Sequence, residues 1–262
     1  MKTGRSLCRK CRRQVSILAG TIFQDTHLPL TTWFRAMWHV TSQKNGISAL
    51  GLQRVLGLGS YKTAWALLHK LRRAMVRPGR EQLRGTVEVD ETYWGGEEEG
   101  AVGRKTEDKA LIMVAAELNG RNIGRIRLRR VLDFQQTTLH GFIREMVQPG
   151  STIRTDGLPT YKGLTGYNHD RRIQKRWPDY RPQPLPRVHR VASLLKRWLL
   201  GTHQGAIAHE HLDDYLNEFT FRFNRRTSAS RGKLFYRLVE QAVQVDPAPF
   251  QNLTKPQPVV YG

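Results

Sequence analysis

The segment Thr86-Val-Glu-Val-Asp-Glu-Thr-Tyr-Trp-Gly-Gly96 predicts a β-strand that closes in a pair of glycines. Val87 and Val89 would form an apolar face of that strand. Glu88 and Asp90 would lie on the opposite face, because side chains alternate along a strand. A carboxylate fixed in the middle of a strand is well placed to be a metal ligand. The alternative is an ordinary amphipathic surface strand with solvated acids, since charged side chains usually lie exposed.

Two more strands are predicted after this segment. Residues 109–118 are almost all apolar, as expected for a central strand, and residues 124–131 alternate between apolar and basic side chains. Asn119-Gly120 lies between them and is typical of a tight hairpin turn. The three strands are therefore expected to be antiparallel.

A helix and a fourth strand follow the hairpin. Asp133 is expected to cap a helix over residues 134–147, and residues 151–157 predict a short strand that ends at Asp156. Together with the later helices, this order predicts a mixed α/β layer architecture. Ligands of such sheets gather at strand ends, so Asp90 and Asp156 can share a site if their strands are neighbours.

The N-terminal part of the chain is predicted to be helical. Residues 30–40, 46–56 and 61–75 have apolar residues at helical spacing. Thr31 or Thr32 is the expected N-cap of the first helix, because hydroxyl side chains accept hydrogen bonds from the first turn. Residues 76–80 contain Pro and Gly and predict the end of this domain.

The second and third of these helices predict a helix-turn-helix. A short turn with two glycines separates them, and Ser60 is the expected N-cap of the third helix. Tyr61, Lys62 and Thr63 would then lie at the end of the helix that meets base edges in DNA. An ordinary helical hairpin, with its apolar residues in a core, is the alternative.

The charge of the chain indicates a polyanionic partner. The 262 residues include 43 Lys and Arg against 22 Asp and Glu, which gives a net charge of +21. Nucleic acid is the first candidate and an anionic membrane surface the second. The apolar stretch near the start covers only residues 15–23, shorter than a membrane span of about 20 residues. We therefore expect a cytoplasmic protein without a membrane partner.

Cys8 and Cys11 form a C-x-x-C pair in a basic segment. A structural zinc site needs four ligands, and the chain contains no second pair of cysteines. Two cysteines also give no disulfide framework, in agreement with a reducing compartment. We interpret residues 1–27 as the remnant of a zinc ribbon. Plain structural or surface cysteines, and a live metal or redox site, are the alternatives.

Basic residues dominate the segment from 171 to 197. Nine of its residues are Lys or Arg, and aromatic residues lie among them, as in a nucleic-acid channel. Prolines predict an irregular loop before a helix over residues 188–200, with Gly201 just past its end. His189 and Lys196 are seven residues apart and therefore share one face of that helix.

Four motifs, in this order, resemble one family of mobile-element enzymes. They are residues 87–96, residues 154–157, residues 188–203 with His189 and Lys196, and residues 215–226. The chain is similar to bacterial insertion-sequence transposases of the DDE type, in the subgroup with an N-terminal zinc ribbon and an Asp-Asp-(Asn/His/Glu)-Lys signature. The resemblance covers roughly residues 8–240 and departs from the family in having one C-x-x-C pair where relatives have two.

The resemblance implies a ribonuclease-H-like α/β fold with flanking helices over residues 85–240. A helix-turn-helix domain over residues 28–80 would precede it, and an extended tail over 241–262 would follow. It further implies two divalent ions, Mg²⁺ or Mn²⁺, held by Asp90, Asp156 and His189. Lys196 would contact a phosphate near the scissile bond.

The third metal ligand is the residue that the sequence defines least. Imidazole suits Mn²⁺ better than Mg²⁺, so His189 could ligate weakly, act through a bound water, or simply face DNA. Glu218 is the best alternative acid. The DNA-binding candidates are Tyr61, Lys62, Thr63, Arg176, Arg187, Arg190 and Arg197.

The leading functional hypothesis is a transposase that binds terminal inverted repeats, cleaves DNA strands and joins them to target DNA, as a homodimer or larger assembly. A truncated or impaired transposase that only binds DNA is the alternative. A ribonuclease-H-like nuclease that acts on hybrids or junctions is a third hypothesis.

Overall fold

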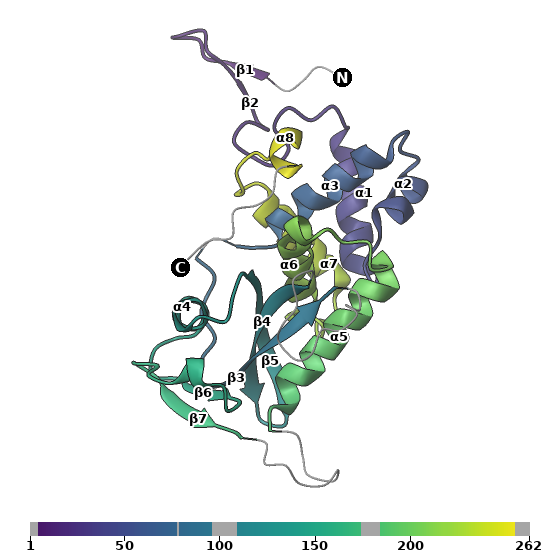
Figure 1. Cartoon of the computed structure of the whole chain (residues 1–262). Helices are drawn as coiled ribbons and strands as arrows, with labels where there is room; N and C mark the ends of the chain where they lie inside the picture. The colour runs from purple at the N-terminus through teal and green to yellow at the C-terminus, as the bar shows by residue number, and fades with distance from the viewer. Residues whose placement is uncertain (1–4, 78, 96–108, 174–183, 255–262) are drawn as a thin grey trace. The chain divides into compact units, whose positions relative to one another are not determined.

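The computed structural model describes residues 5–77, 79–95, 109–173 and 184–254, and the chain divides into two compact units (Figure 1). One unit combines Met1–Pro78 with Thr227–Pro256, and the other contains Gly79–Arg226. The predicted loop with Arg176, Trp177 and Tyr180 lies outside the described residues.

A five-stranded mixed sheet forms the centre of the second unit, in the order β5-β4-β3-β6-β7. β4 is antiparallel to both β3 and β5, which confirms the three predicted antiparallel strands and the central place of β4. β6 is parallel to β3 and to β7. The strands are β3 (Thr86–Trp94), β4 (Ala110–Asn119), β5 (Asn122–Val131), β6 (Thr152–Thr155) and β7 (Asn168–Arg171).

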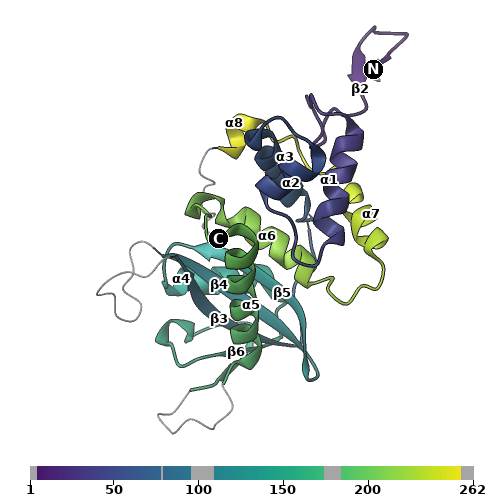
Figure 2. The same cartoon turned by 90° about the vertical axis from the view of Figure 1, so that its right-hand side faces the viewer.

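Helices cover both faces of this sheet (Figure 2). α4 (Gln136–Met146) packs on the face that buries Val87 and Val89, as the alternation in β3 predicts. α5 (Pro186–His203) and α6 (Leu212–Phe223) pack on the opposite face. The apolar side chains of the central strands are thus buried on both sides, at roughly 1.5–3 kcal/mol for each large residue.

The hairpin between β4 and β5 is confirmed. β4 ends at Asn119 and β5 begins at Asn122, and Gly120 has a φ of 57°. Glycine tolerates this left-handed conformation without a Cβ clash, which is why the turn can be this tight.

Three predicted helix ends were wrong. α1 (Leu30–Ser42) has Pro29 at its N-cap, so Thr31 and Thr32 lie inside its first turn. Proline suits a helix start because its fixed φ is already helical and its missing N–H costs nothing there. Gly201 lies inside α5, which continues to His203.

Asp133 is not the N-cap of α4, which is Gln135. Its carboxylate instead accepts a hydrogen bond from the Gln135 N–H at 3.0 Å and one from the Thr138 hydroxyl at 2.6 Å. Asp133 therefore supports the first turn from two residues upstream of the N-cap.

The first unit is built from helices. α1, α2 (Ala49–Leu56) and α3 (Tyr61–Ala74) agree with the predicted helical segment, and Ser60 is the N-cap of α3 as predicted. Gly57 ends α2 in the left-handed conformation. The remaining elements are β1 (Arg5–Leu7), β2 (Gln14–Ser16), α7 (Arg231–Ala242) and α8 (Phe250–Leu253), the last within the segment predicted to be extended.

Glu88 connects β3 to the start of α5. Its side chain is buried, and Oε2 accepts hydrogen bonds from the backbone N–H of Arg187 at 2.7 Å and of Val188 at 3.1 Å. The Arg187 guanidinium lies 3.4 Å from the other oxygen. The first N–H groups of a helix have no partner within the helix, and its N-terminus favours negative charge. A carboxylate from the sheet thus provides the cap of α5.

We predict that Glu88→Ala destabilises this unit by about 2–4 kcal/mol, because it leaves two N–H groups and one guanidinium without their acceptor. Glu88→Gln keeps one carbonyl acceptor and should lose less. Denaturant unfolding and hydrogen exchange at the Arg187 and Val188 amides measure the effect. Glu145→Ala, at an exposed ion pair with Arg129, is the control and should change stability by less than about 0.5 kcal/mol. Full protection of both amides in Glu88→Ala would contradict the cap.

Candidate active site

Asp90, within β3, lies level with Asp156, the residue directly after the neighbouring strand β6. β3 and β6 are parallel, and Glu88 is paired with Arg154. Asp90 follows Glu88 by two residues, and Asp156 follows Arg154 by two residues. One carboxylate oxygen each from Asp90, Glu91 and Asp156 lies within 4.8 Å of the other two. The structure therefore brings together the two acids that the sequence indicated and adds a third.

The turn after β6 holds Asp156. Its Oδ1 accepts a hydrogen bond from the Leu158 N–H at 2.9 Å, so the side chain folds back over the start of the turn. Thr155, the last residue of β6, is fully buried. The aspartate is thus half-buried at a strand end that is fixed on both sides.

His189 reaches the same place from α5. Its Nε2 lies 3.0 Å from Oδ2 of Asp90, and its side chain is 40% exposed. This hydrogen bond is the main cause that raises the pKa of His189 above its usual value, although burial acts against it. Lys196 lies two turns further along α5 and is exposed.

Glu91 was missed at the level of sequence, although it directly follows Asp90. Strand alternation places it on the face opposite Asp90, and it was not among the predicted site residues. Tyr161, at the end of a short 3₁₀ helix (Pro159–Tyr161), donates a hydrogen bond from its hydroxyl to Oε2 of Glu91 at 3.0 Å. Burial, followed by the charge of Glu91, raises the pKa of Tyr161 well above its usual value, so this phenol remains a donor.

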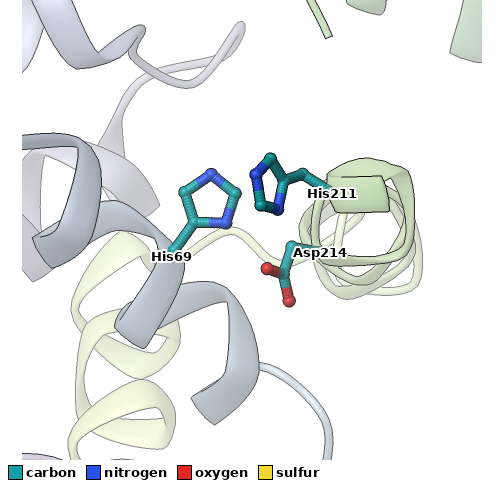
Figure 3. A group of neighbouring side chains, drawn as sticks. All are labelled: His69, His211 and Asp214. Atoms are coloured by element: carbon teal, nitrogen blue, oxygen red, sulfur yellow. The ribbon is translucent and has the colours of Figure 1, made fainter. Parts of the chain in front are cut away.

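The acids of α6 lie outside the carboxylate group around Asp90. Asp213 accepts a hydrogen bond from the Arg130 N–H of β5 at 2.9 Å, and burial raises its pKa. His211 and Asp214 project from the start of α6 (Figure 3). His69, also drawn there, belongs to the other unit, where it packs on Trp65 within α3. Glu218 is fully buried in α6 and is absent from the described carboxylate group around Asp90.

The DNA-binding candidates lie in different environments. Tyr61 and Lys62 are exposed at the start of α3, and Thr63 is half-buried. Arg187 is engaged with Glu88, whereas the side chains at 190 and 197 on α5 are exposed arginines. Arg176 lies outside the described residues.

Cys8 and Cys11 are exposed at the turn of the β1–β2 hairpin. The backbone N–H of Cys11 is the main cause that lowers the pKa of the Cys8 thiol. No group of metal-ligating side chains around these cysteines was found among the described residues.

Residues 82–224 match the model of the ISXO2-like transposase domain. This match covers more than half of the 262 residues, and the chain belongs to that family. This match assigns residues 82–224 to a transposase domain.

Two further similarities are weaker. The chain is 26% identical over 240 residues to an uncharacterized protein in transposable element ISH50 of Halobacterium salinarum, with 83% of this chain and 78% of that protein covered. A chain in the cryo-EM structure of a simian T-cell lymphotropic virus intasome in complex with the PP2A regulatory subunit B56 gamma is 16% identical. That match covers 70% of each chain with a TM-score of 0.37, which supports no conclusion here.

Membership in this family implies a divalent metal, and the residues present suit one. Asp90, Glu91 and Asp156 offer carboxylate oxygens, the donors that Mg²⁺ and Mn²⁺ take in proteins. Carboxylates this close repel one another unless a cation or proton balances them.

Within the described residues, no helix combines the length and the apolar character that a membrane span requires.

The pKa of His189 provides a test of the geometry without metal. Because the pKa in the folded state is raised, the stabilisation from the Asp90–His189 pair is complete below the ordinary pKa of about 6.5 and is lost as the pH rises through the folded value. We predict that an NMR titration in EDTA finds the His189 pKa above that of free histidine, and that Asp90→Asn lowers it. A titration curve identical in the two proteins would contradict the contact.

Proposed function

We propose that this chain is a transposase that binds the terminal inverted repeats of its element, cleaves DNA there and joins the ends to target DNA. The grouping of Asp90, in the middle of β3, with Asp156, directly after β6, within a domain of the transposase family, is the observation that carries this proposal. The proposed reaction is phosphoryl transfer, in which a protein contributes mainly by positioning the reactants and neutralising charge.

The catalytic unit is proposed to have a ribonuclease-H-like fold. Three antiparallel strands in the order β5-β4-β3, extended by the parallel strands β6 and β7, are compatible with this fold. So are the helices on both faces of the sheet. The proposed site lies beside β3, just past the end of β6.

Asp90 and Asp156 are proposed to hold the divalent ions. Bound Mg²⁺ or Mn²⁺ would activate the attacking hydroxyl or water and neutralise charge on the scissile phosphate. His189 orients the Asp90 carboxylate through Nε2 and is a further metal-binding candidate. Lys196, exposed on the same helix, is proposed to contact a backbone phosphate near the bond that breaks.

DNA binding is proposed for both units. Tyr61 and Lys62 begin α3, the second helix of the proposed helix-turn-helix, where side chains reach base edges in the major groove. Arg190 and Arg197 are exposed on α5 and suit phosphate contacts. With a net charge of +21, binding should weaken steeply as salt is raised.

A second candidate function is sequence-specific DNA binding without cleavage. The imidazole at position 189 favours it, because Mg²⁺ prefers oxygen ligands. A protein of this kind would bind terminal repeats and leave them intact with every divalent ion.

We predict that Asp90→Asn and Asp156→Asn each lower strand cleavage of terminal-repeat DNA in Mn²⁺ or Mg²⁺ by roughly 10²-fold or more. Repeat binding should be retained, because neither change removes a cation. Glu145→Gln removes one carboxylate elsewhere in the unit and should cleave like the parent. Cleavage that persists in both aspartate variants would overturn the proposal. Binding by the parent without cleavage in either ion would favour the second candidate.

A further inference from the structure

We infer that Glu91 is a third carboxylate ligand of the divalent-metal site and that Tyr161 positions it. This inference rests on the proposed function and extends it to two residues outside the Asp-Asp-His-Lys set. It starts from geometry, since an oxygen of Glu91 lies within 4.8 Å of oxygens of both Asp90 and Asp156.

The end of β6 beside this part of β3 allows Glu91 to approach the two aspartates. Asp90 and Glu91 leave β3 on opposite faces, and β6, the neighbouring strand, ends one residue before Asp156. Past that strand end no β6 backbone separates the two faces. The Glu91 side chain can therefore reach the same space as the two aspartates.

Tyr161 is built to hold this carboxylate in place. Its side chain is fully buried in the cluster between α4 and the sheet, so the ring has a fixed position. Its hydroxyl donates to Oε2 of Glu91 at 3.0 Å. Residues that orient metal ligands by hydrogen bonds typically contribute about 10- to 100-fold in metal affinity.

The chemistry of position 189 gives Glu91 a reason to ligate. Of Asp90, Asp156 and His189, only the two aspartates offer the oxygen donors that Mg²⁺ prefers. With Glu91 the site has three carboxylates before α5 contributes anything. His189 can then serve chiefly as the hydrogen-bond partner of Asp90.

A structural role for Glu91 makes a different prediction. The Tyr161–Glu91 hydrogen bond ties the 3₁₀ turn to β3, and this link needs only an acceptor at position 91. Glutamine offers a carbonyl oxygen and keeps the link, but it does not carry the negative charge of a metal ligand. Glu91→Gln therefore separates the two roles.

The experiment is a titration of the full-length chain with Mn²⁺, in which free Mn²⁺ is measured by electron paramagnetic resonance. Glu91→Gln should raise the Kd for the tightest Mn²⁺ by about tenfold or more, and Tyr161→Phe by about tenfold. His189→Gln should change it less than Glu91→Gln does. Glu145→Gln, which removes one carboxylate from the same unit, should bind like the parent.

The outcomes separate this inference from the proposed function. If Asp90→Asn and Asp156→Asn abolish tight Mn²⁺ binding while Glu91→Gln binds like the parent, the inference is overturned and the proposed site stands. If the aspartate variants also bind like the parent, the proposed site itself fails. Thermal unfolding confirms that each variant folds. If Glu91→Gln does not fold, Glu91→Asp keeps a carboxylate and must bind Mn²⁺ within a few-fold of the parent. A loss of Mn²⁺ affinity in Tyr161→Phe then supports the positioning role of Tyr161. Unchanged affinity in that variant contradicts it.

Discussion

The parallel pairing of β3 with β6 is the constraint on which the proposed active site depends. Its register sets Asp90 and Asp156 level with each other, although 65 residues separate them in the chain. A shift of one residue in this pairing would turn one aspartate to the other face of the sheet. The buried valines of β3 oppose such a shift, because it would expose Val87 and Val89 or bury acids in their place. Core packing and the geometry of the carboxylates are thus fixed by the same hydrogen bonds.

The cap of α5 extends this constraint to the helix. Glu88 precedes Asp90 by two residues on the same face of β3, and its carboxylate fixes the first N–H groups of α5. Val188 is the second residue whose N–H donates a hydrogen bond to Glu88, and His189 follows it directly. His189 therefore lies beside Asp90. One face of one strand provides both the anchor of the helix and the carboxylate that the helix contacts. The same cap fixes the position of Lys196, which lies two turns further along α5.

Sequence patterns predicted much of this arrangement and failed at identifiable points. Alternation and turn residues predicted three antiparallel strands, and the family resemblance indicated Asp90, Asp156 and His189. The sequence could not show that β3 and β6 are neighbours, because parallel pairing leaves no local pattern. Glu91 was not among the predicted site residues. The sequence does not show that β6 ends beside it, which is what lets its side chain approach the two aspartates. Helix ends were misplaced where a typical capping residue, such as Thr31 or Gly201, lay inside the helix.

The central claim is that the acids on β3 and after β6 form a divalent-metal site. Anomalous scattering from crystals of this chain soaked in Mn²⁺ tests it most directly. We expect a manganese peak in contact with the carboxylates of Asp90 and Asp156, with Glu91 as a further oxygen neighbour. The absence of manganese from these three carboxylates at saturating Mn²⁺, with the fold intact, would contradict it.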